Sequence, residues 1–422
     1  MHGSFIDLTP LRSSSGFRRL WLGGLVSAFA AQLAVVAVLF HVWEETGSPL
    51  WTGMVGLVSA AAMTAGSLLG GTAADRYDRT RVLRWTTLGQ LLAGLGLTVQ
   101  ALPDLALGAA PGVTLVLVLV AANAFCAGFG AASRRSLPAR LLDHLQLPAG
   151  IALLHLGVQG ALLLGPAIGG VVIGAFGLAA CFGICAAALC VALWTVLRLP
   201  PVPPPAATGA SPWAMTREGL RHVSRPGAVR GAFGTDLFAT LLVMPVSLFP
   251  MINEMRLDGA PETLGMMTSS VAVGGLLAGL LSGAVMRRQR LGRIQSGAAA
   301  VWCLALIGYG LSPTLGTILL CLAVAGAADT VSVIARGAIV QLVTPDARRG
   351  RVSAAEHVIG AAGPDVGNAR SGLVAQLVGA PASLVGGGIL ALIGIGWIAA
   401  RNRHLRDFRR SDFSGGDQTD TL

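Results

Sequence analysis

Long apolar stretches alternate with short polar clusters along the whole chain. A helix needs roughly 20 apolar residues to cross the hydrocarbon core of a bilayer. Twelve stretches have about that length, and each predicts one membrane-spanning helix. Their ranges are 18–43, 50–73, 82–102, 112–133, 149–175, 178–198, 228–251, 262–286, 294–311, 314–337, 352–378 and 382–400.

The polar clusters between these stretches alternate in charge. Arginines precede the first stretch and follow the second, fourth, sixth, eighth, tenth and twelfth, whereas the opposite clusters are acidic and hold one arginine, Arg256. Cytoplasmic loops of membrane proteins carry the excess of basic residues. We therefore expect both termini in the cytoplasm. The acids of the opposite clusters are Glu44, Glu45, Asp104, Glu254, Asp258 and Glu262.

A proline-rich segment divides the chain into two halves of six stretches each. The segment 199–227 begins with "LPPVPPPAATGASP", which cannot form a helix. The basic loops "GTAADRYDRTR" and "GAVMRRQRLGR" hold equivalent places in the two halves and favour an internal repeat with pseudo-two-fold symmetry. We predict a six-helix bundle at 1–198, a cytoplasmic linker at 199–227, a second bundle at 228–400 and a cytoplasmic tail at 401–422.

Composition supports a membrane protein and argues against other classes. The chain of 422 residues is 54% hydrophobic and only 12% charged, whereas soluble domains carry about 25% charged residues. Its net charge of +10 comes from arginines spread over the loops, without the basic and aromatic platform of a nucleic-acid-binding protein. No phosphate-binding loop, nucleophile motif or metal-ligand cluster is present. We therefore expect no enzyme activity, cofactor, metal or nucleic-acid partner.

The loop after the second stretch resembles a known signature. Its pattern is similar to the loop between the second and third helices of the major facilitator superfamily, with Asp78 in place of the usual glycine and Ala73 in place of leucine. The "ADRYDR" variant resembles the branch that includes bacterial enterobactin exporters. The resemblance implies the major facilitator fold and a charged latch that favours the outward-open state. The alternative is a simple basic loop that only sets topology. The residues concerned are Gly71, Asp75, Arg76, Asp78, Arg79 and Arg81.

The fifth stretch holds a second pattern, "GPAIGG", formed by Gly165, Pro166, Gly169 and Gly170. It resembles the antiporter motif of the same superfamily, which accompanies export by proton antiport. Here Ala161 stands where that motif often has glycine. Glycines permit close helix packing, and a proline bends a helix. The alternative is an ordinary glycine-rich helix interface.

Charged residues inside a membrane are costly and indicate function. The resemblance implies that the first, fourth, seventh and tenth helices line a central cavity. Asp236 and Asp329 fall in the seventh and tenth, so one of them is our hypothesis for the proton carrier. The alternative is a structural pair of Asp329 with Arg336. Asp365 at a helix kink is a candidate for gating or binding, and Arg370 for pairing with Asp365 or an anionic substrate.

Three further polar residues extend these candidates. Gln32 and Asn123 could bind substrate through hydrogen bonds or join helices to one another. We expect Glu356 to form a cytoplasmic ion pair with the nearby arginines of the 348–351 loop. The hypothesis as a whole is a proton-coupled exporter of an amphipathic small molecule, such as a siderophore, working by alternating access.

Three other functions stay open at this stage. A multidrug or macrolide-type efflux pump uses the same scaffold, a substrate-uptake facilitator is a further transporter hypothesis that the Gly165-Pro166 pattern disfavours, and a membrane sensor or assembly protein is the alternative from another class. We expect a monomer in the bacterial cytoplasmic (inner) membrane, with a small-molecule substrate, protons and the lipid bilayer as partners.

Overall fold

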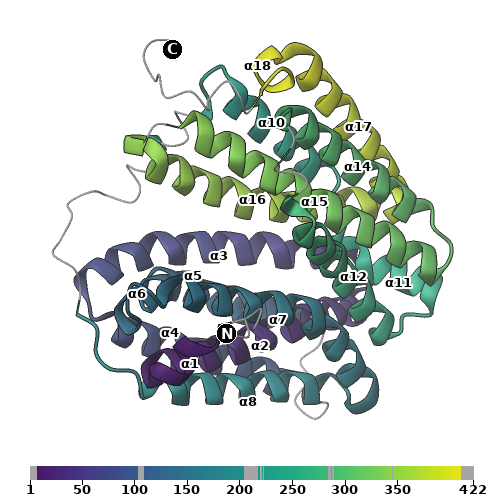
Figure 1. The fold of residues 1–422 in the computed structure, drawn as a ribbon. Helices are drawn as coiled ribbons and strands as arrows, with labels where there is room; N and C mark the ends of the chain where they lie inside the picture. The colour runs from purple at the N-terminus through teal and green to yellow at the C-terminus, as the bar shows by residue number, and fades with distance from the viewer. Residues whose placement is uncertain are drawn as a thin grey trace. The chain divides into compact units, whose positions relative to one another are not determined.

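The computed structural model describes residues 7–102, 109–203, 217–218, 221, 223–283, 287, 289–344 and 346–409. Side chains are not described at 109–110, 346–351, 353–355, 357–358 and 361–362. Every regular element in the described ranges is a helix (Figure 1). The all-helical prediction is therefore confirmed for this part of the chain.

The long helices follow the predicted apolar stretches closely. In the part of the chain that the structure describes, ten helical spans are long and apolar enough to cross a membrane, and the more polar helices α4 and α16 occupy the other two predicted stretches. The bounds are α2 (Ser15–Thr46), α3 (Pro49–Arg76), α4 (Arg79–Gln100), α5 (Ala109–Ser136), α7 (Leu147–Phe176), α8 (Leu178–Leu197), α10 (Ala228–Leu242), α11 (Phe249–Leu257), α12 (Pro261–Leu280), α14 (Leu291–Leu311), α15 (Leu315–Val343), α16 (Asp346–Val378) and α17 (Ala380–Arg401).

The chain divides into two compact units. Unit 1 comprises 1–212 with 249–269, and unit 2 comprises 213–248 with 270–422. Within unit 1, α3 packs along α5, α2 packs on α7 and α8, and α4 contacts α5 and α8. Within unit 2, α14 packs on α15 and α17, and α10 contacts α16 and α17. Each unit thus buries its own apolar clusters among its own helices.

Glycines bring α3 and α5 into backbone contact. Gly66 faces the main chain at Phe125, Gly70 faces the main chain at Phe129, and Gly128 faces the carbonyl of Met63. A Cβ atom at any of the three would collide with that main chain. Helices in lipid associate through such small residues, because no hydrophobic force drives them together there.

The predicted span 228–251 is wrong as a single continuous helix. Helix α10 ends at Leu242, and a short 3₁₀ turn, η2 (Val246–Leu248), leads into α11. Pro245 explains the break, because proline has no N–H to donate and disfavours helical backbone at the residue before it. Two hydrogen bonds to Asn368 on α16 hold the interrupted segment. The Ser247 N–H donates to the Asn368 side-chain oxygen at 3.1 Å, and the Ser247 hydroxyl donates to the Asn368 carbonyl at 2.8 Å.

The chain after α17 stays packed on unit 2 as far as Phe408. Short helix α18 (Arg403–Arg406) is capped by Asn402, whose side chain accepts from Leu405 N–H and donates to the carbonyl of Gly227. Leu405 and Phe408 are buried in the cluster of α10, α14 and α15. Hydrogen bonds from Arg406 lower the pKa of the exposed Asp407 below its ordinary value. The predicted tail from 410 onward lies outside the described residues.

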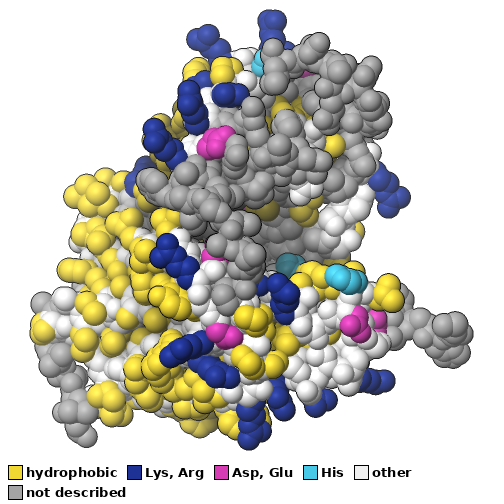
Figure 2. All heavy atoms as spheres, turned by 90° about the vertical axis from the view of Figure 1, so that its left-hand side faces the viewer, with side chains coloured by type: hydrophobic (Ala, Val, Ile, Leu, Met, Phe, Trp, Pro, Cys, Tyr) yellow, Lys and Arg dark blue, Asp and Glu magenta, His cyan; other side chains and the backbone are white. Residues whose placement is uncertain are grey.

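Arginine side chains gather at helix ends in each unit. Figure 2 shows many arginine and few acidic side chains. Arginines stand in the last turns of α3, α5 and α17 and in the short helices α1 (Thr9–Ser13) and α6 (Pro138–Leu141). These positions are the ones that the alternating loop charges select in the sequence.

Candidate functional site

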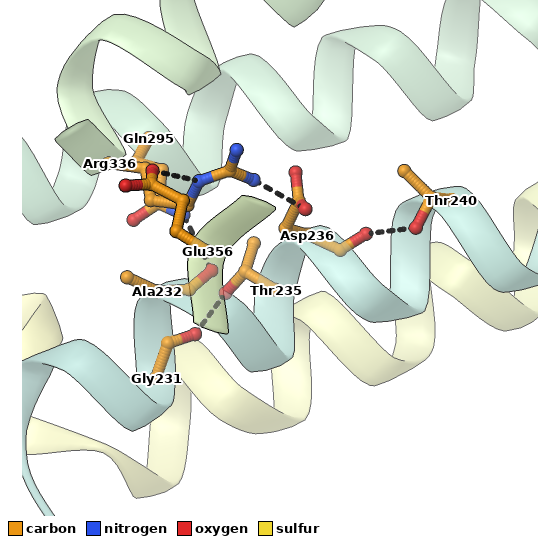
Figure 3. A network of polar contacts seen from close by, with 8 residues as sticks. All are labelled: Gly231, Ala232, Thr235, Asp236, Thr240, Gln295, Arg336 and Glu356. Atoms are coloured by element: carbon orange, nitrogen blue, oxygen red, sulfur yellow. Dashed lines mark hydrogen bonds and ion pairs between the residues drawn. The ribbon is translucent and has the colours of Figure 1, made fainter. Parts of the chain in front are cut away.

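Three helices of unit 2 bring opposite charges together. Asp236 of α10 and Glu356 of α16 lie on either side of the Arg336 guanidinium from α15 (Figure 3). Arg336 Nη1 forms an ion pair with Asp236 Oδ2, and both side chains are at least 90% buried. Arg336 Nε lies 3.6 Å from Glu356 Oε1, and the Glu356 side chain is 29% exposed. One cation therefore faces two carboxylates, one held closely and one loosely.

The surroundings of Arg336 combine one aromatic face with unused polar atoms. The guanidinium carbon lies 5.5 Å from the centroid of the Phe233 ring. Gln295 donates from Nε2 to the carbonyl of Ala232 at 2.7 Å. Its Oε1 and Arg336 Nε are buried and have no hydrogen-bond partner among the described residues, so the contact that Arg336 Nε makes there is the looser ion pair with Glu356.

Two threonines beside Asp236 are satisfied within α10. Thr235 donates to the carbonyl of Gly231 and Thr240 donates to the carbonyl of Asp236, each at 2.9 Å. Hydroxyls that bond back to the preceding turn cost little in a helix. The two threonine hydroxyls therefore do not donate to the Asp236 carboxylate, which pairs with Arg336.

Asp329 and Arg336, the alternative structural pair, form no ion pair among the described side chains. Seven residues separate the two on α15, which corresponds to roughly 10 Å along the helix axis. Arg336 reaches across to α10 and α16 instead. Glu356, expected to pair with arginines of the 348–351 loop, lies against Arg336; the side chains of that loop are outside the description. Asp329 is partly buried and has no ion pair among the described residues.

Arg370 makes a contact that the sequence did not indicate. Its Nη1 donates to the carbonyl of Leu242, the last residue of α10. The break before Pro245 leaves that carbonyl without a helical donor, and a guanidinium at a helix C-terminus also suits the helix dipole. No pair of Arg370 with Asp365 forms among the described side chains, and Asp365 is partly buried one residue after Pro364.

The loop between α3 and α4 is built around a helix cap. Asp78 is the N-cap of α4 and accepts from Arg81 N–H at 2.8 Å, which explains an acidic residue at a position where the family has glycine. Asp75 and Arg76 lie in the last turn of α3 and form no ion pair among the described residues. The close contact to α5 beside Gly71 is made by its neighbour Gly70, which the sequence analysis did not select.

The start of α4 is bonded to the chain that follows α8. Arg79 N–H donates to the carbonyl of Val202, and the Thr80 hydroxyl donates to the carbonyl of Pro200. Arg84 Nη2 donates to the carbonyls of Leu197 and Leu199 at 3.1 and 3.0 Å. Because these acceptors are main-chain carbonyls, no side-chain pattern in the sequence could have indicated them.

The glycine-proline pattern of α7 forms two helix contacts within unit 1. Gly165 and Gly169 face Gln32 and Leu33 of α2, so Gln32 packs against this pattern. Gly170 faces the main chain at Pro261, the first residue of α12. Ala167 N–H, next to Pro166, donates to the hydroxyl of Ser269 on α12 at 3.0 Å. The last polar candidate, Asn123, accepts from Gln90 of α4 at 3.3 Å and so joins α5 to α4.

The described residues contain no group of three or more His, Cys, Asp or Glu side chains that could hold a metal ion. The charged cluster of unit 2 and the break between α10 and α11 suit the movement of a small solute or ion. Comparison with known proteins agrees with this interpretation. The sequence profile of the Major Facilitator Superfamily matches residues 20–355, and the chain belongs to that family of membrane transporters.

The chain is similar in sequence to proteins named as exporters. The chain is 26% identical over 395 residues to the enterobactin exporter EntS of Shigella boydii serotype 18 (strain CDC 3083-94 / BS512), covering 92% of each chain. It is 24% identical over 394 residues to the enterobactin exporter EntS of Citrobacter koseri (strain ATCC BAA-895 / CDC 4225-83 / SGSC4696), again covering 92% of each. A solved structure of the nucleoside transporter NupG (D323A mutant) shares the fold, with a TM-score of 0.74, 13% identity and coverage of 91% and 99%.

Proposed function

We propose that this protein exports an amphipathic small molecule of the siderophore class by alternating access, driven by proton antiport. The similarity to enterobactin exporters extends over 92% of the chain, which supports export and the substrate class. The observation that carries the coupling mechanism is the sharing of Arg336 between two carboxylates.

The cluster has the charge balance that proton coupling requires. With Arg336, Asp236 and Glu356 all ionised, one negative charge is left over in a mostly buried place. A proton on Asp236 removes that excess and releases Arg336 from its close partner, so the guanidinium can turn toward Glu356. A nearby negative charge raises the proton affinity of a carboxylate, and a nearby positive charge lowers it. Asp236 is the proposed proton carrier, and Asp329 stays the second candidate.

Transport in inverted membrane vesicles tests this proposal. A pH gradient would be imposed, and uptake of a catecholate siderophore and of a fluorescent drug panel would be followed for the parent chain and for Asp236→Asn, Asp329→Asn and Glu44→Gln. Glu44 is exposed at the end of α2 and serves as the control acid. We expect gradient-driven siderophore uptake that is lost in Asp236→Asn and kept in Glu44→Gln. Uptake that ignores the gradient and both aspartate substitutions would refute proton antiport.

A multidrug efflux pump is the second candidate function. The partly exposed Glu356 and the excess negative charge of the cluster also suit a cationic drug. The same vesicles distinguish the two functions, because drug uptake without siderophore uptake supports the pump. The absence of any transported solute under any gradient would favour a membrane sensor or assembly protein instead.

We further propose that the α3–α4 loop acts as the conformational latch of the family, with Asp75 as its working acid and Asp78 as a structural cap. Asp75 lies at the helix end without an ion pair among the described residues, whereas Asp78 is already bonded to Arg81 N–H. Asp75→Asn should slow transport without lowering thermal stability, and Asp78→Ser, which keeps a capping oxygen, should leave both near the parent. Equal transport by Asp75→Asn and the parent would contradict the latch.

A further inference from the structure

A pocket of about 650 Å³ opens at the arginine-rich end of unit 1. Three chain segments meet around it: the junction of α1 and α2 at 13–19, the end of α6 and its connection to α7 at 140–146, and the end of α8 with the residues after it at 197–200. Its size is within the range of sites that hold small ligands. None of the residues discussed above as transport candidates lines this pocket.

The charge lining the pocket suits an anion. Arg19, Arg140 and Arg198 contribute three guanidinium groups against a single aspartate, Asp143. Arg19 Nη1 donates to the carbonyl of Arg198 at 2.7 Å. This bond joins two of the three segments and leaves the other N–H donors of Arg19 available. Guanidinium groups present several donors in a planar array that matches phosphate oxygens.

Two serines just before α2 shape the same pocket. Ser13 donates to Gln146 at 2.8 Å and Ser14 donates to the carbonyl of Leu141 at 2.9 Å, so both serines fix the pocket wall. The first main-chain N–H groups of this 32-residue helix lie beside them, and the positive end of the helix dipole favours an anion there.

The surface next to the pocket indicates that the anion comes from lipid. Large apolar side chains are exposed on α8 at Ile184, Val191, Trp194 and Leu197, which form one stripe along the helix and end at Arg198. The guanidinium carbon of Arg198 lies 4.0 Å from the centroid of the Trp194 ring. Tryptophan is enriched where a helix crosses the headgroup region. An acyl chain along this stripe would place its headgroup at the pocket.

We propose that this pocket binds the phosphate-bearing headgroup of an anionic phospholipid, with Arg19, Arg140 and Arg198 as its ligands. A free phosphate ion offers the same oxygen chemistry but has no use for the apolar stripe of α8. Bound lipid would bridge the start of α2, the α6–α7 connection and the end of α8 from outside. The site shares no residue with the charged cluster of unit 2, so the lipid proposal can be tested independently of the proposed transport.

Lipid retention by the purified full-length protein tests the site. Phosphatidylglycerol and phosphatidylcholine with the same acyl chains would be offered in equal amounts, and bound lipid would be counted by native mass spectrometry. The variants are Arg140→Gln, Arg198→Gln and their double, with Arg230→Gln as the control, since Arg230 is an exposed arginine at the start of α10 that does not line the pocket. Size-exclusion profiles would verify that each variant is folded.

We expect the parent and Arg230→Gln to prefer phosphatidylglycerol, and the preference to fall about fivefold for each pocket arginine removed. Arg140 is exposed, so its single substitution keeps the test open if the double variant does not fold. Equal preference in the parent and the pocket variants would overturn the proposal. Displacement of the lipid by excess inorganic phosphate, with equal stabilisation by phosphate alone, would also overturn it, since the ligand would then be the free ion.

Discussion

Arg336 and Asp236 form a buried ion pair between two helices that are a hundred residues apart in sequence. Removing one partner of such a pair leaves an uncompensated charge, at a cost of about 3–5 kcal/mol. Arg336→Met should therefore lower the thermal stability of the purified protein strongly. The double variant Asp236→Leu/Arg336→Met should recover much of that loss, because neither pair charge stays behind. Thermal unfolding of the parent, both single variants and the double variant measures this, and strictly additive losses would contradict the pairing.

Transport by the same double variant separates structure from mechanism. A purely structural pair predicts that transport returns together with stability. The proposed proton carrier predicts a folded protein that no longer couples siderophore movement to a pH gradient, because the carboxylate is gone.

Glu356 should matter less to stability than Asp236. Its nearest oxygen lies 3.6 Å from Arg336 Nε, beyond hydrogen-bond range, and its side chain is 29% exposed. Glu356→Gln should therefore cost about 1 kcal/mol or less, as partly solvated ion pairs do. A loss of stability equal to that of Asp236→Asn would show that both carboxylates hold Arg336 equally.

Two glycines of α7 offer a matched pair of substitutions. A Cβ atom at Gly170 would collide with the main chain at Pro261, whereas a Cβ at Gly160 meets no neighbour within 4 Å. Gly170→Ala should destabilise the protein by about 1–3 kcal/mol through overpacking. Gly160→Ala should be neutral or stabilising by about 0.5–1 kcal/mol, since alanine favours helix. Thermal unfolding distinguishes them, and equal behaviour would mean that α7 and α12 do not pack as described.

Arg370 should be required for the break between α10 and α11. Arg370→Met leaves the partly buried Leu242 carbonyl without its donor, which should cost at most the roughly 1–3 kcal/mol of a fully buried unsatisfied group. Arg370→Lys keeps a charged donor and should restore part of the stability. If methionine and lysine behave alike, water satisfies the carbonyl and the guanidinium is dispensable. Increased proteolysis near Met244 in the methionine variant would localise the effect to the break.

The helices could be predicted from sequence because a membrane-spanning helix needs a long apolar run, and such a run is visible in the local sequence without knowledge of tertiary contacts. The predicted stretch 149–175 differs from α7 by only a few residues. The break after Leu242 was also legible in Pro245, but the apolar residues around it concealed the interruption. The sequence indicated that Asp236 and Arg336 were costly in a membrane, and so selected them both.

Which charges pair could not be predicted, because pairing depends on how helices rotate against one another. The spacing of Asp329 and Arg336 favoured a pair along one helix, yet the arginine reaches two other helices. The same limit applies to Arg370, whose partner is a main-chain carbonyl on another helix. Asp78 was different, since an acid just before a helix is a cap by local sequence alone.

The bonds from the start of α4 to the carbonyls of 197–202 have a mechanical consequence. Val202 is buried with Leu83 and Leu199 in one cluster, and Arg79 and Arg84 hold the main chain on either side. A force that pulls on the chain beyond Val202 therefore acts on α8 through the chain itself and on α4 through these hydrogen bonds. The segment 199–203 is thus held as part of unit 1, next to the charged loop between α3 and α4.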